Sequence, residues 1–69
     1  SMQLKKKFYM KNKNNVMDIL IDSFDGEYMY GFTSNYIRVK VPAKESISNH
    51  IINTKMLDFQ SGIMNGQRV

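Results

Sequence analysis

From Val16 onward the chain consists of short stretches in which apolar and polar residues alternate, separated by turn signals. These stretches span residues 16–22, 27–33, 36–41, 50–58 and 63–64. Alternation with a period of two is typical of a strand with one face buried. Five short strands in a chain of 69 residues predict an all-β sandwich or barrel. We favour a small five-stranded β-barrel, because closure removes the sheet edges that a small sheet cannot otherwise protect.

Turn residues set the limits of these strands. Asp25-Gly26, Ser34-Asn35 and Ser61-Gly62 are plausible tight turns, and asparagine tolerates the positive φ that such turns require. Pro42 is expected to end its strand, since proline cannot donate a hydrogen bond to a neighbouring strand. We expect Asn65-Gly66 to break the last strand soon after it begins.

Residues 1–14 form a different kind of segment, which we interpret as a leader or linker preceding a barrel domain at 15–69. Ser1-Met2 has the form of a cloning scar followed by an initiating methionine, so we expect a piece cut from a longer protein. Leu4 and Phe8 have helical i, i+4 spacing. The asparagines that follow interrupt a helix, so the leader is predicted to be a short helix or disordered.

The positive charge is unevenly distributed. Five of the ten basic residues fall within the first thirteen positions, where there is no acidic residue, and the remainder carries five basic against six acidic residues. The net charge of +4 is compatible with a polyanionic partner. A solvated lysine-rich tail explains it equally well, so charge alone does not identify a nucleic-acid site.

Several classes of function are excluded or disfavoured. The chain has no cysteine, which excludes disulfides and cysteine-bound zinc or iron–sulfur clusters on this polypeptide. No apolar run approaches the roughly 20 residues of a membrane span, and we expect a cytoplasmic protein. His50 stands alone, and Asp18 and Asp22 are interpreted as solvated residues of one strand face. No catalytic residue and no metal site are predicted.

The stretch 36–41 carries the most informative pattern. Tyr36, Arg38 and Lys40 alternate onto one face, which aligns one aromatic ring with two cations. Unpaired RNA is commonly held in this way, with bases stacked on rings while cations contact phosphates. Tyr28 adds a further ring nearby, whereas Phe32 is expected to fill the barrel interior.

Residues 31–42, Gly-Phe-Thr-Ser-Asn-Tyr-Ile-Arg-Val-Lys-Val-Pro, closely resemble a signature of the TRAM domain. This domain is a small OB-like β-barrel at the C-terminus of radical S-adenosylmethionine tRNA methylthiotransferases. The Asn-Tyr-Ile sequence is most similar to the branch acting on N6-threonylcarbamoyladenosine in tRNA. The similarity extends over about residues 4–66, although its distinctive part is only the dozen residues quoted.

The resemblance implies a tRNA-binding domain that holds the anticodon stem-loop, without catalytic residues or cofactors of its own. Two 4Fe-4S clusters and S-adenosylmethionine are expected in the parent enzyme, bound by an upstream radical domain that is a further expected partner. The candidate RNA-binding residues are Thr33, Asn35, Tyr36, Arg38, Lys40 and Lys55. Gly31 is expected to permit close approach of backbone or tight curvature of the barrel, and Asn35 is expected to set the turn. The alternative is a protein-interaction module that docks a ribosomal protein or the enzyme's own catalytic domain.

Overall fold

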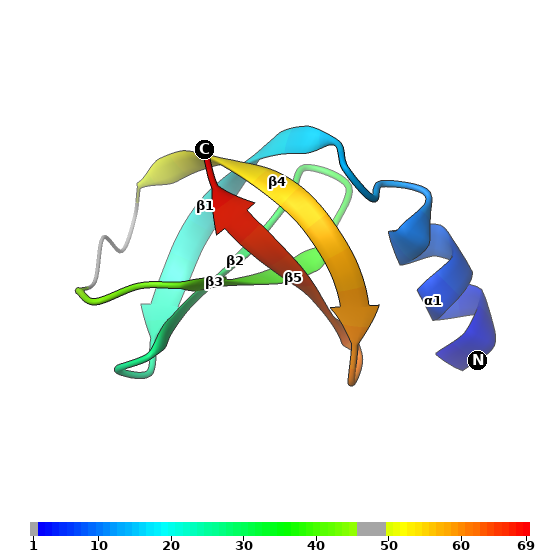
Figure 1. The fold of residues 1–69 in the computed structure, drawn as a ribbon, viewed down its shortest axis with the longest axis horizontal. Helices are drawn as coiled ribbons and strands as arrows, with labels where there is room; N and C mark the ends of the chain where they lie inside the picture. Colours follow the sequence, from blue (N-terminus) through cyan, green and yellow to red (C-terminus); the bar gives the residue numbers. More distant parts are fainter. Residues whose placement is uncertain (1, 46–49) are drawn as a thin grey trace.

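A computed structural model describes residues 2–45 and 50–69 and shows a closed five-stranded barrel with one helix (Figure 1). The elements are α1 (Met2–Met10), β1 (Val16–Phe24), β2 (Tyr28–Phe32), β3 (Arg38–Pro42), β4 (Ile51–Gln60) and β5 (Ile63–Arg68). The order around the barrel is β1-β2-β3-β5-β4, with every pair antiparallel except β3 and β5. The predicted fold class, a small all-β OB-like barrel, is confirmed.

The two longest strands bend so that the small sheet can close. The register of β1 shifts between Ile21 and Ser23, and that of β4 shifts between Met56 and Phe59. An irregularity of this kind increases local twist and bends a strand. In the closed barrel β1 pairs with β2 and β4, and β4 pairs with β1 and β5.

The barrel interior is filled by the side chains that point inward from each strand. Its fully buried side chains are Ile19, Ile21, Met29, Ile37, Val39, Val41, Thr54, Met56 and Met64. Two glycines allow strands to approach closely. A Cβ on Gly31 would lie 2.4 Å from the Leu20 carbonyl oxygen, and one on Gly66 would lie 2.5 Å from Thr54 Cγ2. The expectation for Gly31 is confirmed.

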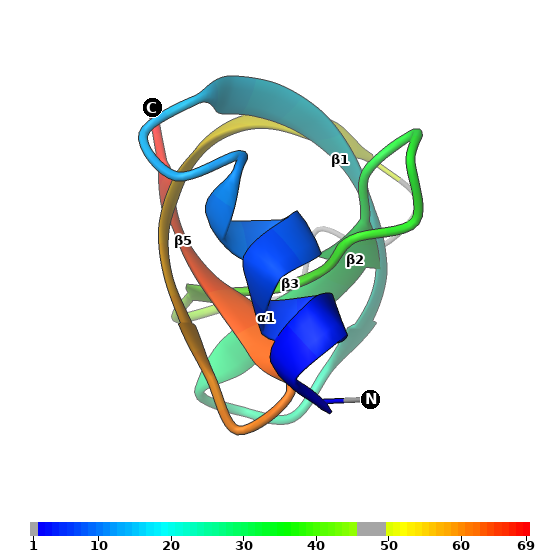
Figure 2. The ribbon, with the colours of Figure 1, turned by 90° about the vertical axis from the view of Figure 1, so that its right-hand side faces the viewer.

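Helix α1 lies across one end of the barrel (Figures 1 and 2). Tyr9 is its one buried residue, and the Tyr9 ring packs edge-on against Phe59 with centroids 4.9 Å apart. Asn14 and Asn15 then exchange backbone hydrogen bonds of 2.7 and 2.8 Å with Met56 of β4. The leader segment therefore contributes to the barrel core through Tyr9.

Three local predictions were wrong. Phe32 lies on the outer face and is 43% exposed, because the even-numbered side chains of β2 point away from the core. Tyr36 does not belong to β3, which begins at Arg38; its φ of 66° places it in the preceding loop. The last strand does not break at Asn65-Gly66 but continues to Arg68, since Gly66 occupies a core position too small for a side chain.

Among the described residues, 2–45 and 50–69, no helix combines the length and the apolar character needed to cross a membrane.

Candidate nucleic-acid interface

The outer faces of β2 and β3 form one surface of alternating rings and cations. We call this surface the β2–β3 face and define it by Tyr28, Tyr30, Phe32, Arg38 and Lys40. Phe32 pairs with Arg38 in the antiparallel register, and Tyr30 pairs with Lys40. Because directly opposed side chains on one sheet face lie close together, the pairing brings rings and cations into contact. Val39, between the two cations, is fully buried, as the alternation predicted.

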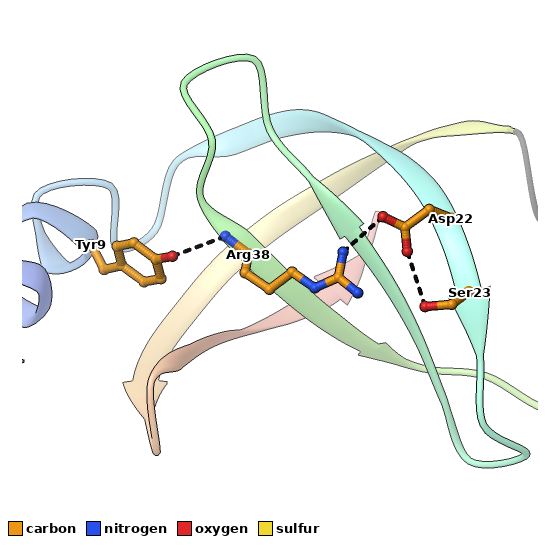
Figure 3. A network of polar contacts seen from close by, with 4 residues as sticks. All are labelled: Tyr9, Asp22, Ser23 and Arg38. Atoms are coloured by element: carbon orange, nitrogen blue, oxygen red, sulfur yellow. Dashed lines mark hydrogen bonds and ion pairs between the residues drawn. The ribbon is translucent and has the colours of Figure 1, made fainter.

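Arg38 has the most constrained side chain of the β2–β3 face (Figure 3). Its Nη1 donates a hydrogen bond of 2.8 Å to Asp22 Oδ2 on β1. Its guanidinium carbon lies 4.5 Å from the Phe32 ring centroid and 5.6 Å from that of Tyr30. Its backbone N–H donates to the Tyr9 hydroxyl at 3.1 Å. Contacts from β1 and β2 thus hold the guanidinium over an aromatic ring, while Tyr9 of α1 holds the Arg38 backbone.

The Asp22 carboxylate neutralises part of the charge on the β2–β3 face. The hydrogen bond from Arg38 is the largest cause that lowers the pKa of Asp22, and a hydrogen bond from the Ser23 hydroxyl lowers it further. Asp22 therefore stays ionised beside Arg38 at neutral pH. The pair is open to water, with side-chain exposures of 28% for Arg38 and 45% for Asp22, so its net stabilisation is small.

Lys40 is the second cation of the face. Its Nζ lies 4.6 Å from the Tyr28 ring centroid, within the range of a cation–π interaction. Within residues 2–45 and 50–69 no carboxylate forms an ion pair with it. An incoming phosphate would meet the Lys40 ammonium without first displacing an acidic side chain of the described part of the chain.

The loop between β2 and β3 presents Tyr36 to solvent. Thr33 Oγ1 donates to Asn35 Oδ1 and accepts the Ile37 N–H at 3.0 Å, and the Tyr36 N–H donates to the Thr33 carbonyl at 3.0 Å. Tyr36 is left with φ of 66° and 82% exposure. A bulky residue with positive φ is strained, and such residues concentrate at functional sites.

The turn between β1 and β2 borders the other end of the face. Asp25 accepts hydrogen bonds from the backbone N–H groups of Glu27 and Tyr28 and from the Tyr30 hydroxyl at 2.7 Å. The Tyr30 contact, followed by the two backbone contacts, lowers the pKa of Asp25 to about 2. The same hydrogen bond raises the pKa of Tyr30. Tyr30 is thereby held in a defined position by the turn.

The structure brings together only some of the predicted site residues. Arg38 and Lys40 share the β2–β3 face, and Tyr36 lies in the adjoining loop. Thr33 is buried and Asn35 is hydrogen-bonded to it, so both shape the loop. Lys55 lies on β4, which neighbours β1 and β5 rather than β2 or β3.

Sequence reasoning missed Phe32 as a member of the β2–β3 face and Asp22 as the partner of Arg38. Both occupy outward positions of their strands, and the alternation around Ile19 and Ile21 was a usable signal for the direction of Asp22. The alternation could not show that β1 lies near enough to β3 for Asp22 to reach Arg38.

Among residues 2–45 and 50–69, no group of three or more histidine, aspartate or glutamate side chains is placed to hold a metal ion. The chain matches no family model, and a comparison with curated proteins finds no relative.

Proposed function

We propose that this chain binds unpaired RNA through the β2–β3 face, as the tRNA-binding TRAM domain of a tRNA methylthiotransferase. The resemblance of residues 31–42 supports the specific substrate, the anticodon stem-loop of a tRNA. Catalysis is assigned to other domains of the parent enzyme. OB-like barrels in general bind oligonucleotides on the face of strands 2 and 3.

The observation that carries this proposal is that two cations lie over aromatic rings beside an exposed tyrosine. Arg38 lies over Phe32 and Lys40 over Tyr28, and Tyr36 projects from a hydrogen-bonded loop at the same end as Phe32. Rings and guanidinium planes accept stacked bases, each worth about 1–3 kcal/mol, and cations contact the phosphates between them. Such a surface binds RNA without needing a large net charge.

The test is a fluorescence-anisotropy titration of the chain with a labelled anticodon stem-loop at several salt concentrations. Each phosphate contact with single-stranded RNA contributes about −0.7 to the slope of log K against log salt. Arg38→Ala and Lys40→Ala should weaken binding and flatten this slope. We expect the larger change in slope for Lys40→Ala, because Asp22 already neutralises part of the Arg38 charge.

Lys55→Ala is the matched control, since it removes one positive charge from an exposed strand position outside the β2–β3 face. It should retain most of the affinity. If Lys55→Ala and Lys40→Ala lost equal affinity for RNA, binding would depend on overall charge, and the proposal that the β2–β3 face is the binding site would be contradicted. Unchanged binding in both Arg38→Ala and Lys40→Ala would contradict the proposal outright.

A second candidate function, protein docking, is favoured by the apolar surface of α1. Met2, Leu4 and Phe8 are 60%, 69% and 44% exposed, and helices that expose several large apolar side chains commonly pack on another protein surface. The partner would be another domain of the parent enzyme or a ribosomal protein. Leu4→Ser and Phe8→Ser should then abolish capture of that partner while leaving the RNA titration unchanged.

A further inference from the structure

An open pocket of about 310 Å³ lies on the outside of the barrel next to the β2–β3 face. We call it the Leu20 pocket. Its wall is formed by Leu20 of β1, Phe32 at the end of β2, Ile51 of β4 and the start of the loop at Thr33 and Ser34. This volume is at the lower end of the range of roughly 300–1,000 Å³ found for small-molecule sites.

The apolar wall is a direct consequence of strand register. Leu20 pairs with Phe32 on one side and with Ile51 on the other, so three large apolar side chains cross the outer surface in one row. Leu20 is 52% exposed and Ile51 is 66% exposed. A row of this kind offers a flat apolar surface to a ring.

Asp18 is the one charged residue that lines the pocket. It lies two residues before Leu20 on the same outward face of β1. In the described part of the chain no side chain or backbone N–H is hydrogen-bonded to its carboxylate. An ionised carboxylate accepts hydrogen bonds only, so the pocket combines an apolar surface with an available acceptor.

Phe32 connects this pocket to the β2–β3 face. It lines the pocket and also carries the Arg38 guanidinium 4.5 Å from its centroid. An RNA strand held by Lys40 and Arg38 would therefore reach the Leu20 pocket at the Phe32 end of the face. Tyr36 is exposed in the loop that begins at the same end.

We propose that the Leu20 pocket accepts one unpaired base of the bound RNA and that Asp18 selects a base with an exocyclic amino group. Adenine, cytosine and guanine each present an amino donor to the carboxylate. Uracil has a carbonyl oxygen where cytosine has its amino group, and its one donor on that edge, N3–H, lies between two carbonyl oxygens that the negative charge of Asp18 repels. This inference rests on the proposed RNA binding and adds a base preference to it.

The experiment compares oligoadenylate, oligocytidylate and oligouridylate of equal length, each fluorescently labelled, in titrations with the full chain at one salt concentration. A hydrogen bond between a base edge and a charged group corresponds to roughly tenfold or more in affinity, so we expect the wild-type chain to favour the adenine and cytosine oligonucleotides over the uracil oligonucleotide by at least about tenfold. Asp18→Asn should remove most of this preference, because the amide can donate to uracil as well as accept from adenine or cytosine.

Glu27→Gln is the control, since it removes one negative charge from the turn between β1 and β2, outside the pocket. It should keep the base preference. A wild-type chain that binds all three oligonucleotides equally, or an Asp18→Asn variant that keeps the preference, would overturn the pocket proposal. If binding without preference is still weakened by Lys40→Ala, RNA binding stands and only the pocket fails, whereas failure to bind any of the oligonucleotides overturns both.

Discussion

The Arg38 guanidinium is hydrogen-bonded to the Asp22 carboxylate at 2.8 Å while it lies 4.5 Å from the centroid of the Phe32 ring. The carboxylate is bonded to Nη1 at one edge of the guanidinium, and the guanidinium carbon lies over the Phe32 ring. An RNA phosphate approaching that edge must displace Asp22, whereas a base can stack on the side of the guanidinium away from Phe32. On the proposed face, Arg38 is therefore better suited to stacking than to neutralising a phosphate.

This relationship predicts that Asp22→Asn binds RNA more tightly than the wild-type chain. The substitution removes the competing anion and leaves a side chain of nearly the same shape. Exposed ion pairs are worth about 0.2–1 kcal/mol, so we expect a gain of up to about fivefold in anisotropy titrations. Glu27→Gln also removes one negative charge, but at a position that does not contact Arg38, so it should give a smaller gain in affinity. A loss of affinity in Asp22→Asn would show instead that the carboxylate is needed to orient the guanidinium.

Tyr36 carries a prediction in which stability and binding change in opposite directions. Its φ of 66° is strained for tyrosine but accessible to asparagine, and the strain of a left-handed residue is about 1–2 kcal/mol. Tyr36→Asn should therefore raise the free energy of unfolding in urea by up to about 1 kcal/mol. Loss of the exposed ring should weaken RNA binding by the equivalent of about 1–3 kcal/mol. A Tyr36→Asn variant that is less stable but binds RNA normally would contradict both the backbone strain at Tyr36 and the stacking role of its ring.

Much of the barrel was predictable because its strands and turns follow from residues that are neighbours in the sequence. Alternation from Val16 onward separates buried from exposed positions, and the turn at Asp25-Gly26 follows from residues that tolerate unusual backbone geometry. The outward direction of Arg38 and Lys40 was predicted by the same alternation. These features require only the neighbours of each residue in sequence.

The remaining features depend on contacts between distant segments. Tyr9 looked like part of a linker, yet it becomes a core residue because α1 covers the barrel end and its hydroxyl meets the Arg38 N–H. Gly66 resembled a strand breaker, although closure of the barrel needs a residue without a side chain next to Thr54. Asp22 reaches Arg38 only after three strands have paired. No local pattern contains this information.

Gly31 provides a direct test of how tightly the barrel is closed. A Cβ at this position would lie 2.4 Å from the Leu20 carbonyl oxygen, and that oxygen belongs to backbone that cannot move independently. Gly31→Ala should lower the free energy of unfolding by about 1–3 kcal/mol, measured by urea denaturation. Asn53→Ala, at an exposed position of β4, should change it by less than about 0.5 kcal/mol. Equal stability of the wild-type chain and Gly31→Ala would show that β1 and β2 are less closely packed than the 2.4 Å distance implies.

The turn between β1 and β2 predicts a dependence of stability on acid. The pKa of Asp25 falls from its ordinary value of 3.8 to about 2 in the folded chain, chiefly through the hydrogen bond from the Tyr30 hydroxyl. A group whose pKa is lower in the folded state stabilises the fold in full above its ordinary pKa, and that contribution is lost as the pH falls toward the folded value. The melting temperature should therefore drop as the pH is lowered from about 4 to about 2, and Asp22, whose pKa is also lowered, adds to the same loss.

Asp25→Asn should be less stable than the wild-type chain at neutral pH and should lose less stability in that acid range, since its side chain does not titrate. Tyr30→Phe tests separately the largest cause of the lowered pKa of Asp25. It removes the hydroxyl donor but leaves the two backbone N–H donors to Asp25. It should show an acid dependence between those of the wild type and Asp25→Asn. Thermal melts followed by circular dichroism across this pH range give all three curves. An unchanged acid dependence in Asp25→Asn would mean that other carboxylates dominate, and that the turn does not hold Tyr30 through the ionised side chain.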